Sequence, residues 1–240
     1  MFFIFFYLQK KKINNAVIEL GDCVRLDKKI IGFSSQNKST ILIPDHFFIS
    51  SQGFLEERKL FLSKHKIKIL RGIWMGSLNS QSRLNFYLFS KVRNLNVNFT
   101  SRKNLYFEKN YEMIIKNFPN GIDFKEKINW LKFLSYLIQI DIEGRAATFS
   151  SLFLKLASGY PTIKIQSDYK QWYYDHLHSL PNLYHVKRDF SDFDEVYNKI
   201  ISDYNNGIIK INNKNNFLQN MKFEDEILNA AKKIDSEFGY

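Results

Sequence analysis

The sequence predicts an α/β protein built on a parallel sheet, and the prediction rests mainly on residues 132–192. Three apolar runs in this stretch, at residues 133–142, 161–165 and 183–187, alternate with segments of helical spacing. The first run is rich in Ile and Leu, which is typical of a strand covered on both faces. Strands that alternate with helices indicate a parallel sheet.

The rest of the chain adds short elements on both sides of this stretch. Strands are predicted at residues 16–20, 41–43, 66–74 and 94–98, and helices at residues 54–65, 83–91, 105–116, 125–129, 146–157 and 223–238. The clearest break in the middle is Pro119-Asn120-Gly121, because proline and glycine interrupt regular structure. We therefore expect an N-terminal lobe at residues 1–120 and a C-terminal lobe at residues 121–240.

Composition narrows the class of protein. Hydrophobic residues make up 45% of the 240 residues and aromatic residues 16%, which excludes a disordered chain. A single cysteine rules out an internal disulfide framework and suits a reducing compartment. The net charge of +11 favours anionic partners such as nucleotides or an anionic membrane surface. Nucleic acid is not the expected partner, since no recognised binding motif accompanies the charge.

Residues 1–8 form an apolar segment that is too short to cross a bilayer. Lysines follow this segment instead of preceding it, which argues against a signal peptide. We interpret the segment as a first buried strand. The alternative is that its aromatic side chains bind to a membrane surface. The expected location is the cytoplasm, and the alternative interpretation adds a peripheral contact at the inner face of the membrane.

Gly144 ends the longest apolar run at the edge where parallel sheets bind ligands. A helix is predicted directly after it, and the free N–H groups at a helix start can hold a phosphate. The chain lacks the G-x-G-x-x-G pattern there, so a dinucleotide site is not expected. The predicted contacts to a diphosphate are Gly144, Arg145, Ala147, Thr148 and Ser150.

Arg71 and Gly72 are expected at the point where a strand runs into a loop. A guanidinium stabilises a diphosphate leaving group well, and glycine allows a ligand to approach the backbone closely. The prediction is that a diphosphate binds between Arg71 and the Gly144–Ser150 turn. A salt-bridged surface arginine is the alternative.

Carboxylates and histidines supply the remaining candidates. Asp22 follows an apolar strand and a glycine, where a carboxylate can act as a general base or simply stabilise a turn. Asp45, after Ile43-Pro44, is the next candidate for a base. His176 and His178 lack the Cys or His partners of a zinc site, and no metal site is expected.

Segments at residues 70–72, 136–144, 146–149, 155–158, 161–166, 168–177 and 185–192 follow one another in an order that is shared with a known family. In this order they resemble glycosyltransferase family 90, the capsule-associated, protein O-glucosyl and bacterial lipopolysaccharide sugar transferases. Residues 168–177 resemble an aromatic helix of that family. Two positions depart from the family pattern, because Ile73 and Ser150 stand where family members carry Ser and, in animals, Arg.

The resemblance implies two facing Rossmann-like lobes of the GT-B type, with a short N-terminal lobe and a donor-binding C-terminal lobe. It implies an inverting, metal-independent hexosyl or pentosyl transfer from a UDP-sugar to a hydroxyl of a glycan or glycolipid, in lipopolysaccharide or capsule synthesis. Asp22 would be the base, and no cofactor is expected besides the UDP-sugar co-substrate. The alternative is a degenerate, non-catalytic nucleotide-sugar or anion-binding protein.

Overall fold

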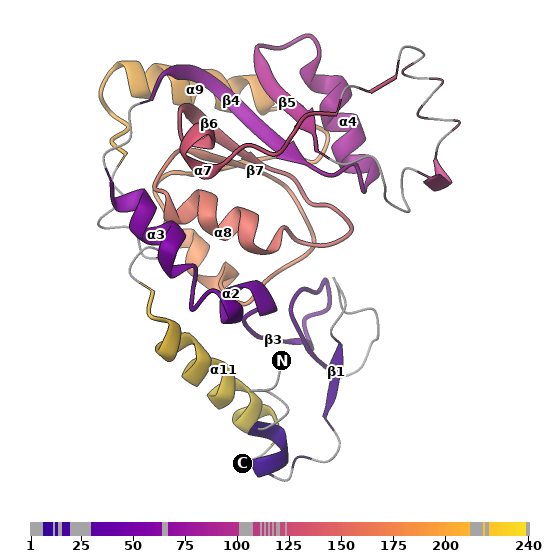
Figure 1. Ribbon diagram of the computed structural model, residues 1–240, viewed down its shortest axis with the longest axis vertical. Coiled ribbons are helices and arrows are strands. Elements are labelled where there is room, and N and C mark those ends of the chain that lie inside the picture. Colours follow the sequence, from indigo (N-terminus) through magenta and orange to yellow (C-terminus); the bar gives the residue numbers. More distant parts are fainter. Residues whose placement is uncertain are drawn as a thin grey trace.

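The protein is an α/β structure whose centre is a five-stranded parallel sheet, as a computed structural model shows (Figure 1). The structure describes residues 7–11, 13, 16–19, 30–63, 67–100, 108–110, 112, 114, 116, 118, 121–122, 124–211, 218 and 221–238. The sheet consists of β4 (Ile69–Gly76), β5 (Leu95–Phe99), β6 (Tyr136–Asp141), β7 (Thr162–Ile165) and β8 (Leu183–Val186). The predicted α/β class with a parallel sheet is confirmed.

The order of the strands, β5-β4-β6-β7-β8, creates a topological switch point between β4 and β6. The chain adds β5 on one side of β4 and then returns to add the other three strands on the opposite side. The helices that follow β4 and β6, namely α4 (Gln81–Ser90) and α8 (Phe149–Ala157), pack into different cores. A sheet of this kind opens a crevice at the carboxyl ends of the two central strands.

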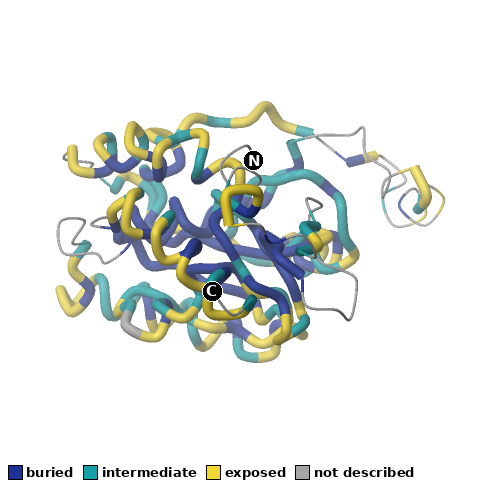
Figure 2. The backbone as a smooth tube through the Cα atoms, turned by 90° about the horizontal axis from the view of Figure 1, so that it is seen from below, coloured by how far each residue is buried: buried dark blue, intermediate teal, exposed yellow. Residues whose placement is uncertain are grey.

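Two hydrophobic cores cover the two faces of the sheet. On one face, α4 and α9 (Phe193–Asn205) pack their aromatic side chains against the strands. On the other face lies α8, with α2 (His46–Ser50) and α3 (Leu55–Leu62) packed beyond it. The central strands β6 and β7 are buried along nearly their whole length (Figure 2), which agrees with the prediction of a strand covered on both faces.

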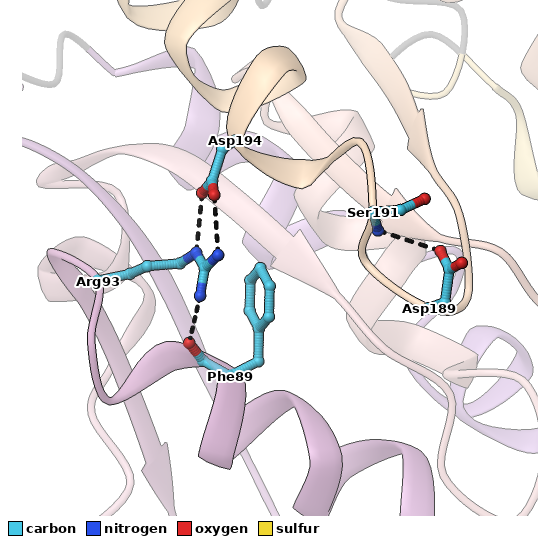
Figure 3. Close-up of polar contacts among 5 residues, drawn as sticks. All are labelled: Phe89, Arg93, Asp189, Ser191 and Asp194. Carbon is cyan, nitrogen blue, oxygen red and sulfur yellow. Dashed lines mark hydrogen bonds and ion pairs between the residues drawn. The ribbon is translucent and has the colours of Figure 1, made fainter.

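Ion pairing adds a surface link between α4 and α9. Nε and Nη2 of Arg93 each donate to a carboxylate oxygen of Asp194 at 2.8 Å, and Nη1 donates to the Phe89 carbonyl at 2.9 Å (Figure 3). The carboxylate of Asp189 accepts a hydrogen bond from the Ser191 backbone N–H in the turn before α9. These contacts fix the loop that leads from β8 into α9.

A smaller parallel sheet contains β1 (Val17–Glu19), β2 (Ile30–Gly32) and β3 (Ile41–Leu42). The last helix, α11 (Phe223–Phe238), returns to the side of this sheet (Figure 1). It buries Ala230 and Ile234 in a core that the sheet shares. Residues 7–10 are helical and lie beside α11, where the Tyr7 hydroxyl donates to Asp235 at 2.7 Å. The strand predicted at residues 1–8 is therefore wrong for its last two residues, and the others lie outside the described residues.

The expected lobe boundary falls inside the connection between β5 and β6. Strands from both sides of residue 120 share the five-stranded sheet, and a parallel bridge joins Phe99 to Phe124. The helix predicted at residues 125–129 does not form. α7 (Trp130–Phe133) begins after it, because the Asn129 side chain accepts from the Lys132 N–H and caps the helix.

Other differences concern where elements begin and end. α8 begins three residues later than predicted, and β4 extends to Gly76. Most of the aromatic segment at residues 168–177 is irregular, and its only helix is the short 3-10 helix η1 (Tyr174–Ser179). No helix in the described ranges combines the length and apolar character needed to cross a membrane.

Candidate functional site

A cleft lies at the switch point, where the carboxyl end of β4 meets the start of α8. It consists of two adjoining cavities of about 890 Å³ and about 260 Å³. The larger cavity extends between α2, α3, the exit of β4 and residues 127–133, and the smaller one surrounds the start of α8. The residues that line both cavities are Phe47, Arg83, Thr148, Ser150 and Ser151.

The smaller cavity has a positive lining. Arg83 and Arg145 line it, and no carboxylate does so among the residues that the structure describes. The first N–H groups of α8 lack acceptors within the helix, and no side chain of the N-cap residue, Thr148, covers them. Such a helix start attracts an anion through its free N–H groups and its dipole.

Thr148 does not cap α8 because its hydroxyl is engaged elsewhere. Its Oγ1 lies 2.7 Å from both carboxylate oxygens of Asp141, the last residue of β6. Nζ of Lys155 lies 3.1 Å from the same carboxylate, and the side chains of Lys155 and Asp141 are only 2% and 1% exposed. This buried ion pair joins α8 to the sheet and leaves the helix start open to the cavity.

Arg83 enters the cleft from the first turns of α4. Nη1 donates to the Ser77 carbonyl at 3.0 Å and Nη2 to the Ile142 carbonyl at 3.3 Å, so the guanidinium bridges the loops after β4 and β6. Burial lowers the pKa of Arg83 to about 10, and attraction to Asp141 and Glu143 opposes this shift. The group therefore keeps its positive charge at neutral pH.

Two buried polar atoms at this site have no hydrogen-bond partner within the described part of the chain. They are Nε of Arg83 and the side-chain oxygen of Asn79. Buried polar atoms are usually paired, so this pair of atoms marks a place where a bound ligand or water is expected.

Gly144 is required at this site because other side chains pack directly against its Cα. A Cβ atom there would lie 2.7 Å from the Asn79 side-chain oxygen and 3.1 Å from Cζ of Arg83. Any larger residue would displace both side chains from the cavity wall. The glycine predicted from sequence thus serves the approach of Asn79 and Arg83, as well as any approach of a ligand.

The predicted diphosphate residues divide into two groups. Five of them line the smaller cavity together: Gly144, Arg145, Ala147, Thr148 and Ser150. Arg71 and Gly72 line neither cavity. Arg71 is exposed and lies five residues before the end of β4, which is roughly 16 Å along a strand. The structure does not bring Arg71 to the turn at Gly144, and it places Arg83 there instead.

Gly72 has a packing role inside β4. A Cβ atom on Gly72 would lie 2.9 Å from Cδ1 of Ile140 and 3.0 Å from Cδ2 of Leu95. Its N–H donates to the Tyr197 hydroxyl of α9 at 3.2 Å. The strand and α9 can approach each other because this position has no side chain. This packing accounts for a glycine at position 72, and no contact with a ligand is needed to explain it.

Asp22 and Asp45 are the two residues predicted as possible general bases, and the structure describes only Asp45. Asp22 lies outside the described residues. Asp45 is buried and caps α2, because its Oδ1 accepts from the N–H groups of Phe47 and Phe48 at 2.8 Å and 3.1 Å. Burial raises the pKa of Asp45, and the two backbone hydrogen bonds oppose the shift. Asp45 lines neither cavity, so its position favours the capping role.

Sequence reasoning missed Arg83, Asn79 and Glu57 as residues of the cleft. A signal for the first two was present, since the apolar run after Gly72 continues the strand to Gly76. The loop at residues 77–80 then belongs at the carboxyl end of the sheet, and Ser80 caps α4 by accepting from the Arg83 N–H.

Metal binding has no candidate within the described ranges, where no group of three or more His, Cys, Asp or Glu residues gathers. Comparison with models of known protein families found no match, and neither did comparison with curated proteins. Any functional conclusion therefore depends on the cleft itself and on the residues that carry the family resemblance.

Proposed function

We propose that the protein is a glycosyltransferase of the kind that the family 90 resemblance implies. It would move a hexose or pentose from a UDP-sugar to a hydroxyl of a glycan or glycolipid, with inversion and without a metal. The main support is the smaller cavity at the switch point, where Arg83, Arg145 and the uncapped start of α8 surround a space that no carboxylate of a described residue lines. This chemistry suits the diphosphate of a nucleotide sugar.

The charge on the leaving group explains why such a cavity assists the transfer. As the bond between the sugar and the diphosphate breaks, negative charge builds on the terminal phosphate. Arg83 and the helix N–H groups are fixed donors that stabilise this charge in the transition state. They supply the positive charge that a metal ion supplies in other transferases.

The larger cavity suits the sugar and the acceptor. Aromatic side chains of Phe54, Trp130 and Phe133 line it together with the hydroxyls of Ser50 and Ser51. An apolar surface with a few polar groups is typical of a small-molecule site. Lipopolysaccharide or capsule precursors are the proposed acceptors, and the proposed location is the cytoplasmic face of the membrane, where such precursors and UDP-sugars would meet.

Calorimetry with UDP in EDTA tests the donor site. We expect binding to persist in EDTA and Arg83→Ala to weaken it by about 1.5–3 kcal/mol, the range for a charge-assisted hydrogen bond. This corresponds to roughly 10–150-fold in affinity. Arg71→Ala is the matched control and should leave the affinity unchanged, because Arg71 lies outside the cleft. Equal losses in the two variants, both still folded, would refute the site.

A second candidate function is non-catalytic binding of a nucleotide sugar or another anion. Ile73 and Ser150 favour it, since they replace the Ser and Arg that family members carry. An assay of UDP release from several UDP-sugars separates the two candidate functions. A transferase releases UDP from a UDP-sugar, whereas a non-catalytic protein binds UDP but does not cleave the UDP-sugar. Loss of release in EDTA, restored by magnesium or manganese, would overturn the metal-independent mechanism.

A further inference from the structure

We propose that Glu57 is the general base that removes the proton from the acceptor hydroxyl. This assignment rests on the proposed transferase function and adds a catalytic residue to it. Glu57 lies in the first turn of α3 and lines the larger cavity, on a different element from those that carry the diphosphate contacts. An inverting transfer needs its base on the acceptor side of the sugar, away from the leaving group.

Glu57 is the one carboxylate among the described residues that line the larger cavity. It is half-buried, and within the described part of the chain the structure gives it no ion pair or hydrogen bond. Its neighbour Glu56 differs in both respects, since it is exposed and pairs with Lys59 at 2.9 Å. Of these two adjacent carboxylates, therefore, Glu57 is the one available to a ligand in the cleft.

The other carboxylates near the switch point already have partners. Asp141 is held by Thr148 and Lys155, and Glu143 accepts a hydrogen bond from the Ser167 hydroxyl. Asp45 caps α2. A base must reach the proton that it removes within hydrogen-bond distance, directly or through one water. Glu57 can do so because, among the described residues, nothing pairs with its carboxylate and its side chain lines the cavity.

In the proposed step, the acceptor oxygen forms a bond to the anomeric carbon while its proton moves to the Glu57 carboxylate. The bond from the anomeric carbon to the diphosphate oxygen breaks, and its electron pair leaves with UDP. Arg83 and the start of α8 stabilise the charge that this electron pair brings. Water can take the place of the acceptor, which gives slow hydrolysis of the donor.

The test measures UDP released from UDP-glucose, UDP-galactose, UDP-N-acetylglucosamine and UDP-xylose, with water as acceptor. Glu57→Gln keeps the size of the side chain and removes the base, so the rate should fall by about 10²–10⁴-fold. UDP affinity measured by calorimetry should stay within about twofold, because the base need not touch the diphosphate. Glu56→Gln is the matched control and should leave rate and affinity unchanged.

Two results would overturn the assignment. One is a folded Glu57→Gln variant that binds UDP and keeps more than about a tenth of the wild-type rate. In that case Asp22→Asn is tested in the same assay, and a loss of activity assigns the base to Asp22. The second result that would overturn the assignment is a wild-type protein that binds UDP but hydrolyses none of the four donors. That result selects the non-catalytic function. A wild-type protein that does not bind UDP at all refutes the proposed function itself.

A folding control separates catalysis from stability. The melting temperature of Glu57→Gln should match that of the wild type, because the side chain has no hydrogen-bond or ion-pair partner to lose among the residues that the structure describes. Glu57→Asp keeps a carboxylate but shortens the side chain, and it should retain a rate between those of Glu57→Gln and the wild type.

Discussion

Replacing Lys155 with methionine removes one member of the buried ion pair that holds the start of α8. The ammonium lies 3.1 Å from Asp141, and the two side chains are 2% and 1% exposed. Methionine is similar in length and apolar, so the packing of α8 against the sheet is largely kept. The Asp141 carboxylate stays buried, and Thr148 remains as the partner that holds it.

The expected loss of stability is large because the buried Asp141 carboxylate loses the one ion-pair partner that it has among the described residues. Removing one partner of a buried ion pair typically costs about 3–5 kcal/mol. For a chain of this size each kcal/mol shifts the melting temperature by about 2–4 °C, so the shift should be roughly 6–20 °C. Burial already lowers the pKa of Lys155, and attraction to Asp141 opposes this shift.

A double variant tests whether the charge, and not the shape, is responsible. Asp141→Asn with Lys155→Met removes both charges and keeps an oxygen that accepts from the Thr148 hydroxyl. Its stability should recover at least half of the loss, because the buried charge is gone. Lys199→Met breaks the exposed pair with Asp203 and should change the melting temperature far less.

Urea unfolding followed by circular dichroism measures these differences for all variants at pH 7. The account is refuted if Lys155→Met costs less than about 1 kcal/mol, well below the range for a broken buried pair. It is also refuted if the double variant is no more stable than the single one. Either result would mean that the buried charges contribute little to holding α8 against the sheet.

Three further predictions concern the glycines and the surface ion pair. Gly144→Ala should lower UDP affinity at least tenfold in calorimetry, because the new Cβ displaces Asn79 and the adjacent guanidinium of the cavity wall. Gly72→Ala should instead cost about 1–3 kcal/mol of stability through overpacking, with unchanged UDP affinity. Arg93→Ala should cost about 0.5–1 kcal/mol at pH 7. The hydrogen bond from Arg93 lowers the pKa of Asp194, so this difference should persist above the ordinary value of 3.8 and disappear as the pH falls below it.

The sequence by itself determined the class of fold and the position of part of the cleft. The apolar run of β6 and the amphipathic pattern of α11 are local signals, because burial on both faces or on one face leaves its own periodicity. Gly144 between a strand and a helix was enough to predict a ligand-binding turn. The five predicted residues that line the smaller cavity are close in sequence, so their proximity did not depend on the fold.

Only the tertiary structure decided which distant residues join that turn. Pairing with β5 carries β4 on to Gly76, which leaves Arg71 inside the strand and brings Arg83 from α4 to Gly144. The same order of strands places α3 beside the cleft, and with it Glu57. Periodicity records which side of an element is buried but not which other element covers it. Strand order and strand ends depend on pairing between segments far apart in the chain, so the cationic wall and the proposed base emerged only from the fold.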